Sequence, residues 1–267
     1  MKLRPNATVF LGGGRITGAL LAGLRLAGHK SPLVVHDRNP QQLRRMKREY
    51  GAITEPDLHR AVACAQLLII AVRPDSVRGL LQKIGRIDRP LNAVSLAAGI
   101  PLANLRRWLP APVRWARAMP SPVCRSGSGL TALAFDRAFA RPARQEVKSL
   151  FARVGSVLEI PEKQFDAFTV AYSCSHGYHA LAGLAEAAHK LGLDRKTSLI
   201  AAAHGLADGI VAWREGKTSL DRLLHEAATP GGISATAMAA MKAAGYHRAV
   251  ARGLEAGMAR ARGNAKG

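Results

Sequence analysis

The sequence predicts an α/β protein: an N-terminal Rossmann-like, doubly wound parallel sheet followed by an all-helical C-terminal domain. Three observations lead to this prediction. Short apolar runs alternate with helical patterns over residues 1–160, a glycine cluster follows the first apolar run, and strand patterns stop near residue 161, where alanine-rich helical patterns begin. We therefore expect a dinucleotide-binding domain over residues 1–160 and a helical domain over residues 161–267.

Each expected strand is a short apolar run bounded by polar or turn-forming residues. The run Leu67–Val72 has six apolar residues and is the clearest of them. The others are Ala7–Gly12, Leu33–His36, Ala93–Ala97, Val113–Ala116, Thr131–Phe135 and Val157–Ile160. Helices are expected between them, for example over Pro40–Tyr50, so the strands should form a parallel sheet with helices on both faces.

The C-terminal part reads as a series of helices separated by glycines. The expected helices are Asp166–Leu191, Arg195–Glu215, Leu220–Ala228, Ile233–Ala244 and Tyr246–Arg262. Gly192, Gly216 and Gly245 stand where helices would end. Because these helices carry many apolar faces and no sheet of their own, we expect them to pack against a second copy in a homodimer or higher homo-oligomer.

Composition excludes several classes of protein. A hydrophobic share of 48% argues against disorder, and no apolar run reaches the roughly 18 residues of a membrane helix, so no membrane partner is expected. The N-terminal residues lack the apolar core of a signal peptide. The three cysteines are widely spaced and odd in number, which fits neither a disulfide framework nor a zinc site. We therefore expect a cytoplasmic protein.

The chain is strongly basic, with 39 Lys and Arg against 18 Asp and Glu, a formal net charge of +21. Such an excess raises the question of nucleic-acid binding. The basic residues are dispersed along the sequence, and aromatic residues, which would stack on single strands, make up only 5% of it. We therefore regard nucleic acid as an unlikely partner and expect the positive field to attract an anionic cofactor.

A glycine cluster, Gly12-Gly13-Gly14-Arg15-Ile16-Thr17-Gly18, lies between the first expected strand and the first expected helix. In a G-x-G-x-x-G loop the glycines allow a tight turn and a close approach of the pyrophosphate to the helix N-terminus. Thr17 occupies the third glycine position, where it could crowd the contact between helix and strand. The cofactor residues predicted here are Gly12, Gly14, Arg15 and Ile16.

The end of the second expected strand should discriminate between NAD and NADP. An acidic residue there pairs with ribose hydroxyls, whereas a neighbouring arginine accommodates a 2′-phosphate. Asp37 thus favours NAD, whereas Arg38 favours NADP. We favour NADPH, bound through Arg38 and Asn39, with NADH possible. The alternative is that Asp37 and Arg38 are solvated charges beside a helix that starts at Asn39-Pro40.

Several further motifs, taken in order, resemble the pyrroline-5-carboxylate reductase family nearly from end to end. Ala71-Val72-Arg73-Pro74 resembles its A-V-K-P segment, and Arg117-Ala118-Met119-Pro120 the start of its R-x-M-P-N-T-P segment. Thr229-Pro230-Gly231-Gly232-Ile233-Ser234 resembles its S-P-G-G-x-T signature. The glycine loop, Ser95–Ile100, Gly129–Leu133 and Gly245–Ala249 also match family segments.

The resemblance implies a Rossmann domain, a helical dimerisation and substrate domain, and NAD(P)H-dependent reduction of 1-pyrroline-5-carboxylate, a small imino acid, to L-proline. It implies that Ala71, Val72, Arg73, Pro74, Ala97 and Gly99 bind the cofactor. It implies that Ser175, Thr229, Gly231, Gly232 and Ile233 bind the substrate and that Ser234 is catalytic, near the ring nitrogen. An alternative for Ser234 is the N-terminal cap of the following helix.

The largest departure from the family is the segment Tyr172–Tyr178, where members usually carry an S-G-S-G-P-A-Y run near the substrate. His176 replaces a proline there, and it would either donate a proton or make one interfacial hydrogen bond. The histidines lack the converging partners of a metal site, so no metal is expected. Two other functions stay open: an imine or keto-acid reductase with a different substrate, or a catalytically silent dinucleotide-binding regulator.

Overall fold

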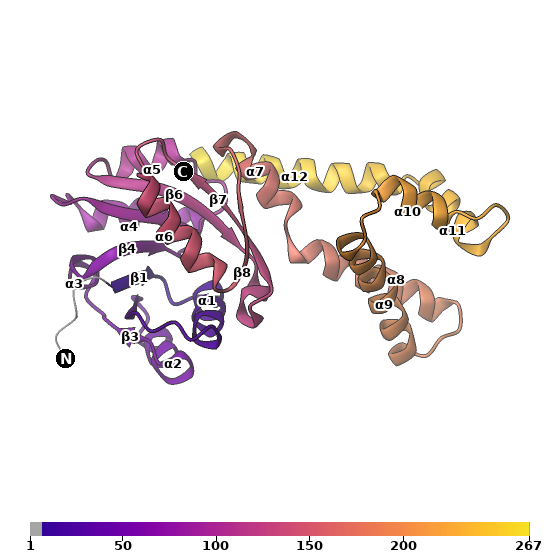
Figure 1. Cartoon of the computed structure of the whole chain (residues 1–267), viewed down its shortest axis with the longest axis horizontal. Coiled ribbons are helices and arrows are strands. Elements are labelled where there is room, and N and C mark those ends of the chain that lie inside the picture. Colours follow the sequence, from indigo (N-terminus) through magenta and orange to yellow (C-terminus); the bar gives the residue numbers. More distant parts are fainter. Residues whose placement is uncertain (1–6, 267) are drawn as a thin grey trace. The chain divides into compact units, whose positions relative to one another are not determined.

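The computed structural model of the chain describes residues 7–266 (Figure 1). These residues form two compact units. The sheet unit comprises the chain up to Ala171 together with the segment from Gly257 onward, and the helical unit comprises Tyr172–Ala256.

The sheet unit contains one eight-stranded sheet with the order β3-β2-β1-β4-β5-β6-β7-β8. The strands are β1 (Ala7–Leu11), β2 (Leu33–His36), β3 (Ile53–Thr54), β4 (Ala65–Ile70), β5 (Leu91–Ser95), β6 (Val113–Pro120), β7 (Gly129–Phe135) and β8 (Gly155–Glu159). The first six strands are parallel to one another. The predicted Rossmann-like fold class is therefore confirmed.

The sheet differs from the sequence expectation in two details: it is not wholly parallel, and it contains one strand that no apolar run predicted. β7 runs antiparallel to β6, and β8 runs parallel to β7. β6 and β7 are joined through a short 3-10 helix, Pro122–Ser126, and so short a connection cannot cross over the sheet as a parallel pair requires. The second difference is β3, a two-residue edge strand too short to give a sequence signal.

Helices cover both faces of the sheet, as in a doubly wound fold (Figure 1). One hydrophobic core lies under α1 (Arg15–Leu26), α2 (Pro40–Tyr50) and α6 (Arg141–Ala152). The other core lies under α3 (Leu58–Ala63), α4 (Pro74–Ile84) and α5 (Leu102–Trp108). Both cores are rich in Leu, Ile and Val from strands with continuous apolar runs, which buried parallel strands require.

Two further helical segments belong to the sheet unit. Phe165 of α7 (Glu162–Ala171) is fully buried against Ala132 and Ala134 of β7. The last part of α12 (Tyr246–Lys266) also returns to this unit. Contacts with the sheet, rather than secondary-structure type, decide which unit a helix joins. The expected domain boundary at 160/161 stays a prediction.

A buried arginine connects β6 to α7. Arg117 is only 1% exposed, and its guanidinium donates to Glu162 Oε1 at 3.1 Å and to Asp166 Oδ1 at 2.5 Å. The same guanidinium lies over the Phe165 ring, 4.2 Å from its centroid. Glu162 Oε1 also accepts the Leu102 backbone N–H at 3.0 Å. One carboxylate thus ties together β6, α5 and α7.

The helical unit contains α8 (Cys174–Lys190), α9 (Arg195–Glu215), α10 (Leu220–Ala227), α11 (Ile233–Ala243) and the first part of α12. The single helix expected over Asp166–Leu191 is wrong, because the chain breaks between α7 and α8. Ser173 is the N-cap of α8, and its Oγ accepts the Ser175 backbone N–H at 3.4 Å. Serine favours such capping positions over helix interiors.

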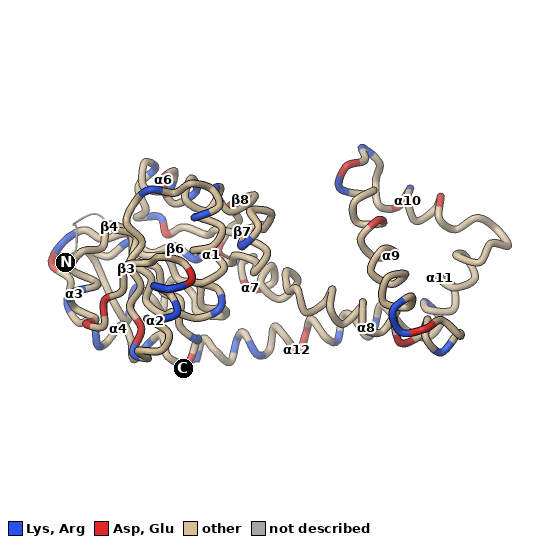
Figure 2. Tube along the Cα trace, turned by 90° about the horizontal axis from the view of Figure 1, so that it is seen from below, with Lys and Arg blue, Asp and Glu red and all other residues tan. Residues whose placement is uncertain are grey.

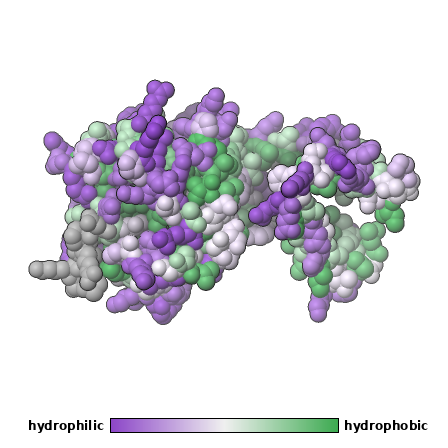
Figure 3. Space-filling model, in the orientation of Figure 1, coloured by the Kyte–Doolittle hydropathy of each residue, from purple (hydrophilic) through white to green (hydrophobic). Residues whose placement is uncertain are grey.

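The helical unit has almost no core of its own. Ser198 and Ala202 are the only buried residues of Tyr172–Ala256, all of which the structure describes. Large apolar side chains are instead exposed, among them Ile233 at 91% and Leu191 at 88%. Apolar surface is visible on these helices in Figure 3. Isolated monomers rarely leave so much apolar surface uncovered. Among the described residues, no helix is long and apolar enough to cross a membrane.

We expect Arg117→Met to lower the free energy of unfolding by about 3 kcal/mol, because Glu162 and Asp166 would lose their counter-ion in a partly buried place. Urea unfolding followed by circular dichroism measures the loss. Arg114→Met in the same strand is the matched control, because Arg114 is less buried and has no such carboxylate pair. Equal losses in the two variants would contradict a stabilising role for the Arg117 contacts.

Candidate dinucleotide-binding site

The glycine loop connects the carboxyl end of β1 to the start of α1. Gly12 has φ +113°, and a Cβ there would lie 2.6 Å from the Ala71 carbonyl oxygen. The Gly12 N–H donates to the His36 carbonyl at 2.8 Å, and the Ala71 N–H donates to the Leu11 carbonyl at 2.8 Å. Gly12 therefore lies where the ends of three strands meet, and only glycine fits this position.

The N-terminus of α1 is open to an anion. The N-cap is Gly14, which has no side chain that could cap the helix, and the first turn contains no acidic residue. A Cβ on Gly14 would meet no atom within 4 Å, and Arg15 beside it is exposed. The unpaired N–H groups and the helix dipole at such an end favour a phosphate. The loop therefore fits a dinucleotide pyrophosphate.

Thr17 does not crowd the loop. Its side chain is fully buried, and its hydroxyl donates to the Gly12 carbonyl at 2.6 Å. Thr17 thus stands where a smaller residue is usual, and its hydroxyl adds an internal hydrogen bond that stabilises the turn.

Asp37 makes internal contacts that sequence reasoning missed. Its Oδ2 accepts the Gly13 N–H at 2.7 Å, and its Oδ1 accepts the Asn39 N–H at 2.8 Å. Arg45 donates to the Gly13 carbonyl at 3.1 Å and places a positive charge nearby. The carboxylate is thus held by the glycine loop. No local signal reveals this role, because Gly13 lies 24 residues earlier in the chain.

Arg38 and Asn39 lie beside this carboxylate on the exposed side of the loop. Asn39 caps α2, since its Oδ1 accepts the Gln41 N–H at 2.9 Å. The expected helix start at Asn39-Pro40 is therefore confirmed. Arg38 is exposed and separate from this capping arrangement, so its guanidinium is available to a ligand phosphate at the end of β2.

The remaining predicted cofactor residues follow the next two strands at the same edge of the sheet. Ala71 and Val72 come directly after β4, Arg73 is the N-cap of α4, and Pro74 is its first residue. Ala97 and Gly99 follow β5 and are buried. Ligands of doubly wound sheets bind beyond the carboxyl ends of the strands, where the strand order reverses around β1. The structure thus brings all these positions to one edge.

The predicted substrate residues lie in the helical unit, most of them at the start of α11. Gly231 has φ +73°, and the Gly232 N–H donates to the Thr229 carbonyl at 2.9 Å, so the segment is a tight turn. Gly232, and not Ser234, is the N-cap of α11. The alternative that Ser234 caps this helix is therefore wrong. Ile233 and Ser234 are both exposed in the first turn.

Ser175 lies apart from this turn, at the start of α8. Its hydroxyl is 2.7 Å from Ser173 Oγ. His176 is exposed in the same helical turn, and its backbone N–H donates to the Ser173 carbonyl at 3.0 Å. Between residues 7 and 266, no three His, Cys, Asp or Glu side chains come together as a metal site would need.

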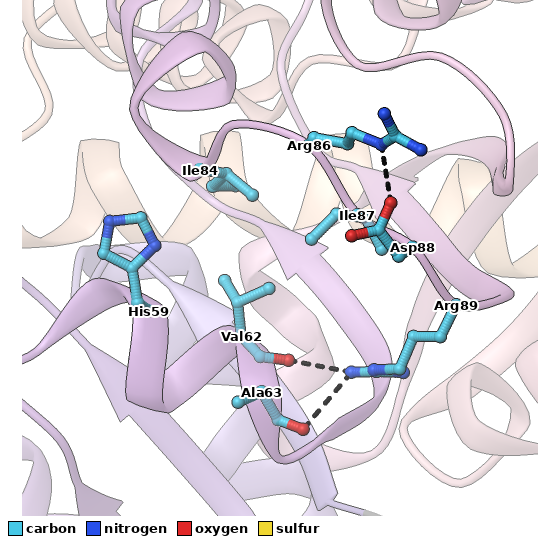
Figure 4. A pocket seen from close by; sticks show the side chains of 8 residues that line it. All are labelled: His59, Val62, Ala63, Ile84, Arg86, Ile87, Asp88 and Arg89. Carbon is cyan, nitrogen blue, oxygen red and sulfur yellow. Dashed lines mark hydrogen bonds and ion pairs between the residues drawn. The ribbon is translucent and has the colours of Figure 1, made fainter.

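Two cavities of the sheet unit lie elsewhere, beside the amino ends of the strands. One, of about 350 Å³, is lined by α3 and the segment before β5, where Arg89 donates to the carbonyls of Val62 and Ala63 (Figure 4). The other, of about 290 Å³, contains His29 and Asn92. Burial, together with the charges of Arg153 and Arg25, lowers the pKa of His29. Neither cavity contains a predicted site residue.

Positive charge is spread over many elements of both units (Figure 2). This dispersal agrees with the sequence, and the expectation that nucleic acid is not a partner stays a prediction.

The strand order, the glycine loop and the open start of α1 define a Rossmann-type dinucleotide-binding protein. The chain belongs to the pyrroline-5-carboxylate reductase family. The enzyme of that name from Thermus thermophilus is 33% identical over an alignment covering 92% of this chain and 94% of that protein. The Mycobacterium tuberculosis enzyme is 29% identical, with 94% of each protein covered.

Family models and solved structures agree with this assignment. Residues 162–264 match the model described as pyrroline-5-carboxylate reductase dimerisation, and residues 8–99 match the one described as NADP oxidoreductase, coenzyme F420-dependent. The Plasmodium falciparum pyrroline carboxylate reductase, solved with NADP bound, superposes with a TM-score of 0.86 at 19% identity and covers 99% of both chains. At that identity the likeness supports the fold.

Proposed function

We propose that this protein reduces 1-pyrroline-5-carboxylate to L-proline with NADPH. One observation carries the proposal: over more than nine-tenths of its length the chain matches reductases of this name. The glycine loop of the sheet unit and the Pro-Gly-Gly turn of the helical unit support the proposal, because each leads into a helix N-terminus that suits an anion.

The sheet unit would hold the cofactor. The pyrophosphate would bind at the start of α1, at Gly12, Gly14, Arg15 and Ile16. Gly12 would contribute the tight turn, because its N–H donates to the His36 carbonyl, and the N–H groups of the first helical turn would face the phosphate. Arg38 with Asn39 would receive the 2′-phosphate. The segments Ala71–Pro74 and Ala97–Gly99 would hold the second nucleotide, across the first strand from Arg38.

Asp37 supports NADPH over NADH. In NAD-binding relatives of this fold an acidic residue at this place pairs with the ribose hydroxyls. Here both carboxylate oxygens already accept backbone N–H groups, from Gly13 and Asn39. These contacts use two of the acceptor sites of the carboxylate and hold it toward the glycine loop. Arg38 beside it is exposed and can contact the ribose substituent, and a guanidinium binds a phosphate far more strongly than a hydroxyl.

The helical unit would hold the substrate. When bound, the nicotinamide supplies a hydride to the carbon of the C=N bond, and the ring nitrogen gains a proton. The free N–H groups at the start of α11, including those of Ile233 and Ser234, suit the substrate carboxylate. The Ser234 hydroxyl would donate to the ring nitrogen, while Thr229, Gly231 and Gly232 shape the turn and Ser175 adds a polar contact.

We infer a homodimer, or a higher homo-oligomer, formed through the helical unit. The unit matches a dimerisation model and has only two buried residues, so its exposed apolar side chains need a partner surface. A second copy supplies the same apolar helices. A cytoplasmic location fits a chain with buried Cys64 and Cys124 thiols that form no disulfide.

Turnover of pyrroline-5-carboxylate should fall about 100-fold in kcat in Ser234→Ala, because the ring nitrogen would lose its hydrogen-bond donor. The assay follows NADPH oxidation at saturating cofactor. Ser149→Ala, an exposed serine on α6, is the control and should keep wild-type turnover. Full activity in Ser234→Ala would remove its catalytic role. If the protein reduces another imine or a keto acid but not pyrroline-5-carboxylate, it is a related reductase with a different substrate. If it binds NADPH but reduces none of these compounds, it is a catalytically silent regulator.

Arg38→Ala should raise the KM for NADPH about tenfold or more and leave the KM for NADH nearly unchanged, because only NADPH carries the 2′-phosphate. Steady-state kinetics with each cofactor measure both values. Arg44→Ala removes an equal charge from an exposed position on α2 and serves as the control. An equal rise in the KM for both cofactors would mean that Arg38 contributes only to the general positive charge and does not contact the 2′-phosphate.

Trp213→Glu on α9 should convert the oligomer to monomers at micromolar concentration, because a charge would be placed in the apolar surface that a second copy covers. Sedimentation velocity measures the change. Leu26→Glu makes the same substitution at an exposed apolar residue of the sheet unit and should leave the assembly intact. A wild-type chain that sediments as a monomer would contradict the inferred dimer.

A further inference from the structure

The end of α12 packs against the segment that follows β5. Asn264 donates from its side-chain Nδ2 to the Ala98 carbonyl at 3.2 Å, and Asn104 on α5 donates from its Nδ2 to the Ala265 carbonyl at 2.6 Å. Ala261, about one helical turn before these contacts, is only 5% exposed. Two side-chain hydrogen bonds of opposite direction thus fasten the helix to the sheet unit.

The backbone at this contact has no room for a larger residue. Gly99 has φ +74°, and a Cβ there would lie 2.5 Å from the Ala261 carbonyl oxygen and 3.0 Å from Asn264 Cβ. One turn further back, a Cβ on Gly257 would lie 2.7 Å from Val170 Cγ1 of α7. The helix therefore approaches the unit closely at two successive places, each through a glycine.

The segment held by α12 is part of the proposed cofactor site. Ala97 and Gly99 follow β5, and the Leu96 N–H donates to the Ile70 carbonyl at 2.9 Å, so this segment lies beside the one that follows β4. Both lie across β1 from β2 in the sheet order. In a doubly wound sheet the two halves of a dinucleotide occupy these opposite sides. The α12 contacts therefore fall on the nicotinamide side.

We propose that Asn264 and Asn104 are positioning residues for the nicotinamide half of the cofactor. This inference rests on the proposed function. By fastening α12 to Ala98 and to α5, the two side chains fix the backbone of Ala97–Gly99, whose left-handed glycine would otherwise sample other conformations. The adenosine half would bind beyond β2, away from the α12 contact, so the two asparagines do not position it.

The test compares two ligands on the full-length protein: NADPH, and 2′,5′-ADP, which has the adenosine half only. We expect Asn264→Ala to raise the Kd for NADPH about fivefold, the effect of losing roughly one hydrogen bond, and to leave the Kd for 2′,5′-ADP unchanged. Tryptophan and NADPH fluorescence titrations give both constants. Arg262→Ala, an exposed neighbour in the same helix, is the matched control and should change neither.

Asn104→Ala removes the second hydrogen bond from the α5 side and should show the same selective loss, even if Asn264→Ala proves too unstable to purify. Unchanged NADPH affinity in the variants, or an equal weakening of both ligands, would overturn the inference while leaving the proposed function standing. A wild-type protein that binds neither ligand would overturn both.

Discussion

The carbonyl oxygen of Ala71 approaches Gly12 so closely that any side chain at residue 12 would collide with it. The Ala71 N–H, which donates to the Leu11 carbonyl, holds the carboxyl ends of β1 and β4 together at this approach, and the Gly12 N–H holds β2 on the other side. Because β2 and β4 then leave β1 in opposite directions, the edge of the sheet opens above the start of α1. The glycine loop, the Asp37 contact and the segments after β4 and β5 all take their places from this junction.

Sequence reasoning located these loops well where the deciding chemistry is local. Glycine spacing predicted the turn after β1, and Asn39-Pro40 predicted the start of α2. Sequence reasoning failed where a residue's conformation depends on a partner far away in the chain or on the geometry of a connection. Asp37 binds Gly13 24 residues away, and the direction of β7 depends on the short connection before it. The break before α8 escaped because serines in an alanine-rich stretch weaken a helical pattern only slightly. The roles of Ser234, Ser175 and Arg38 stay predictions.

The two units differ in how they are stabilised. The sheet unit has two extensive apolar cores and a buried Arg117 that ties β6 to α7. The helical unit has neither, and its helices gain little from packing within one chain. For such a segment folding and association become one equilibrium, and its stability depends on protein concentration. α12 begins in the helical unit and ends in the sheet unit, so the helix belongs to both.

The hydrogen bond between Asn264 and Ala98 joins residues 166 positions apart. During synthesis at roughly 5 to 20 residues per second, Asn264 is added at least about 8 s after Ala98. The strands of the sheet unit up to β8 are complete well before that. The segment after β5 therefore lacks its hydrogen bond to Asn264 until the end of α12 has left the ribosome. A nascent chain can pair its strands early, but it completes this part of the site only when α12 has emerged.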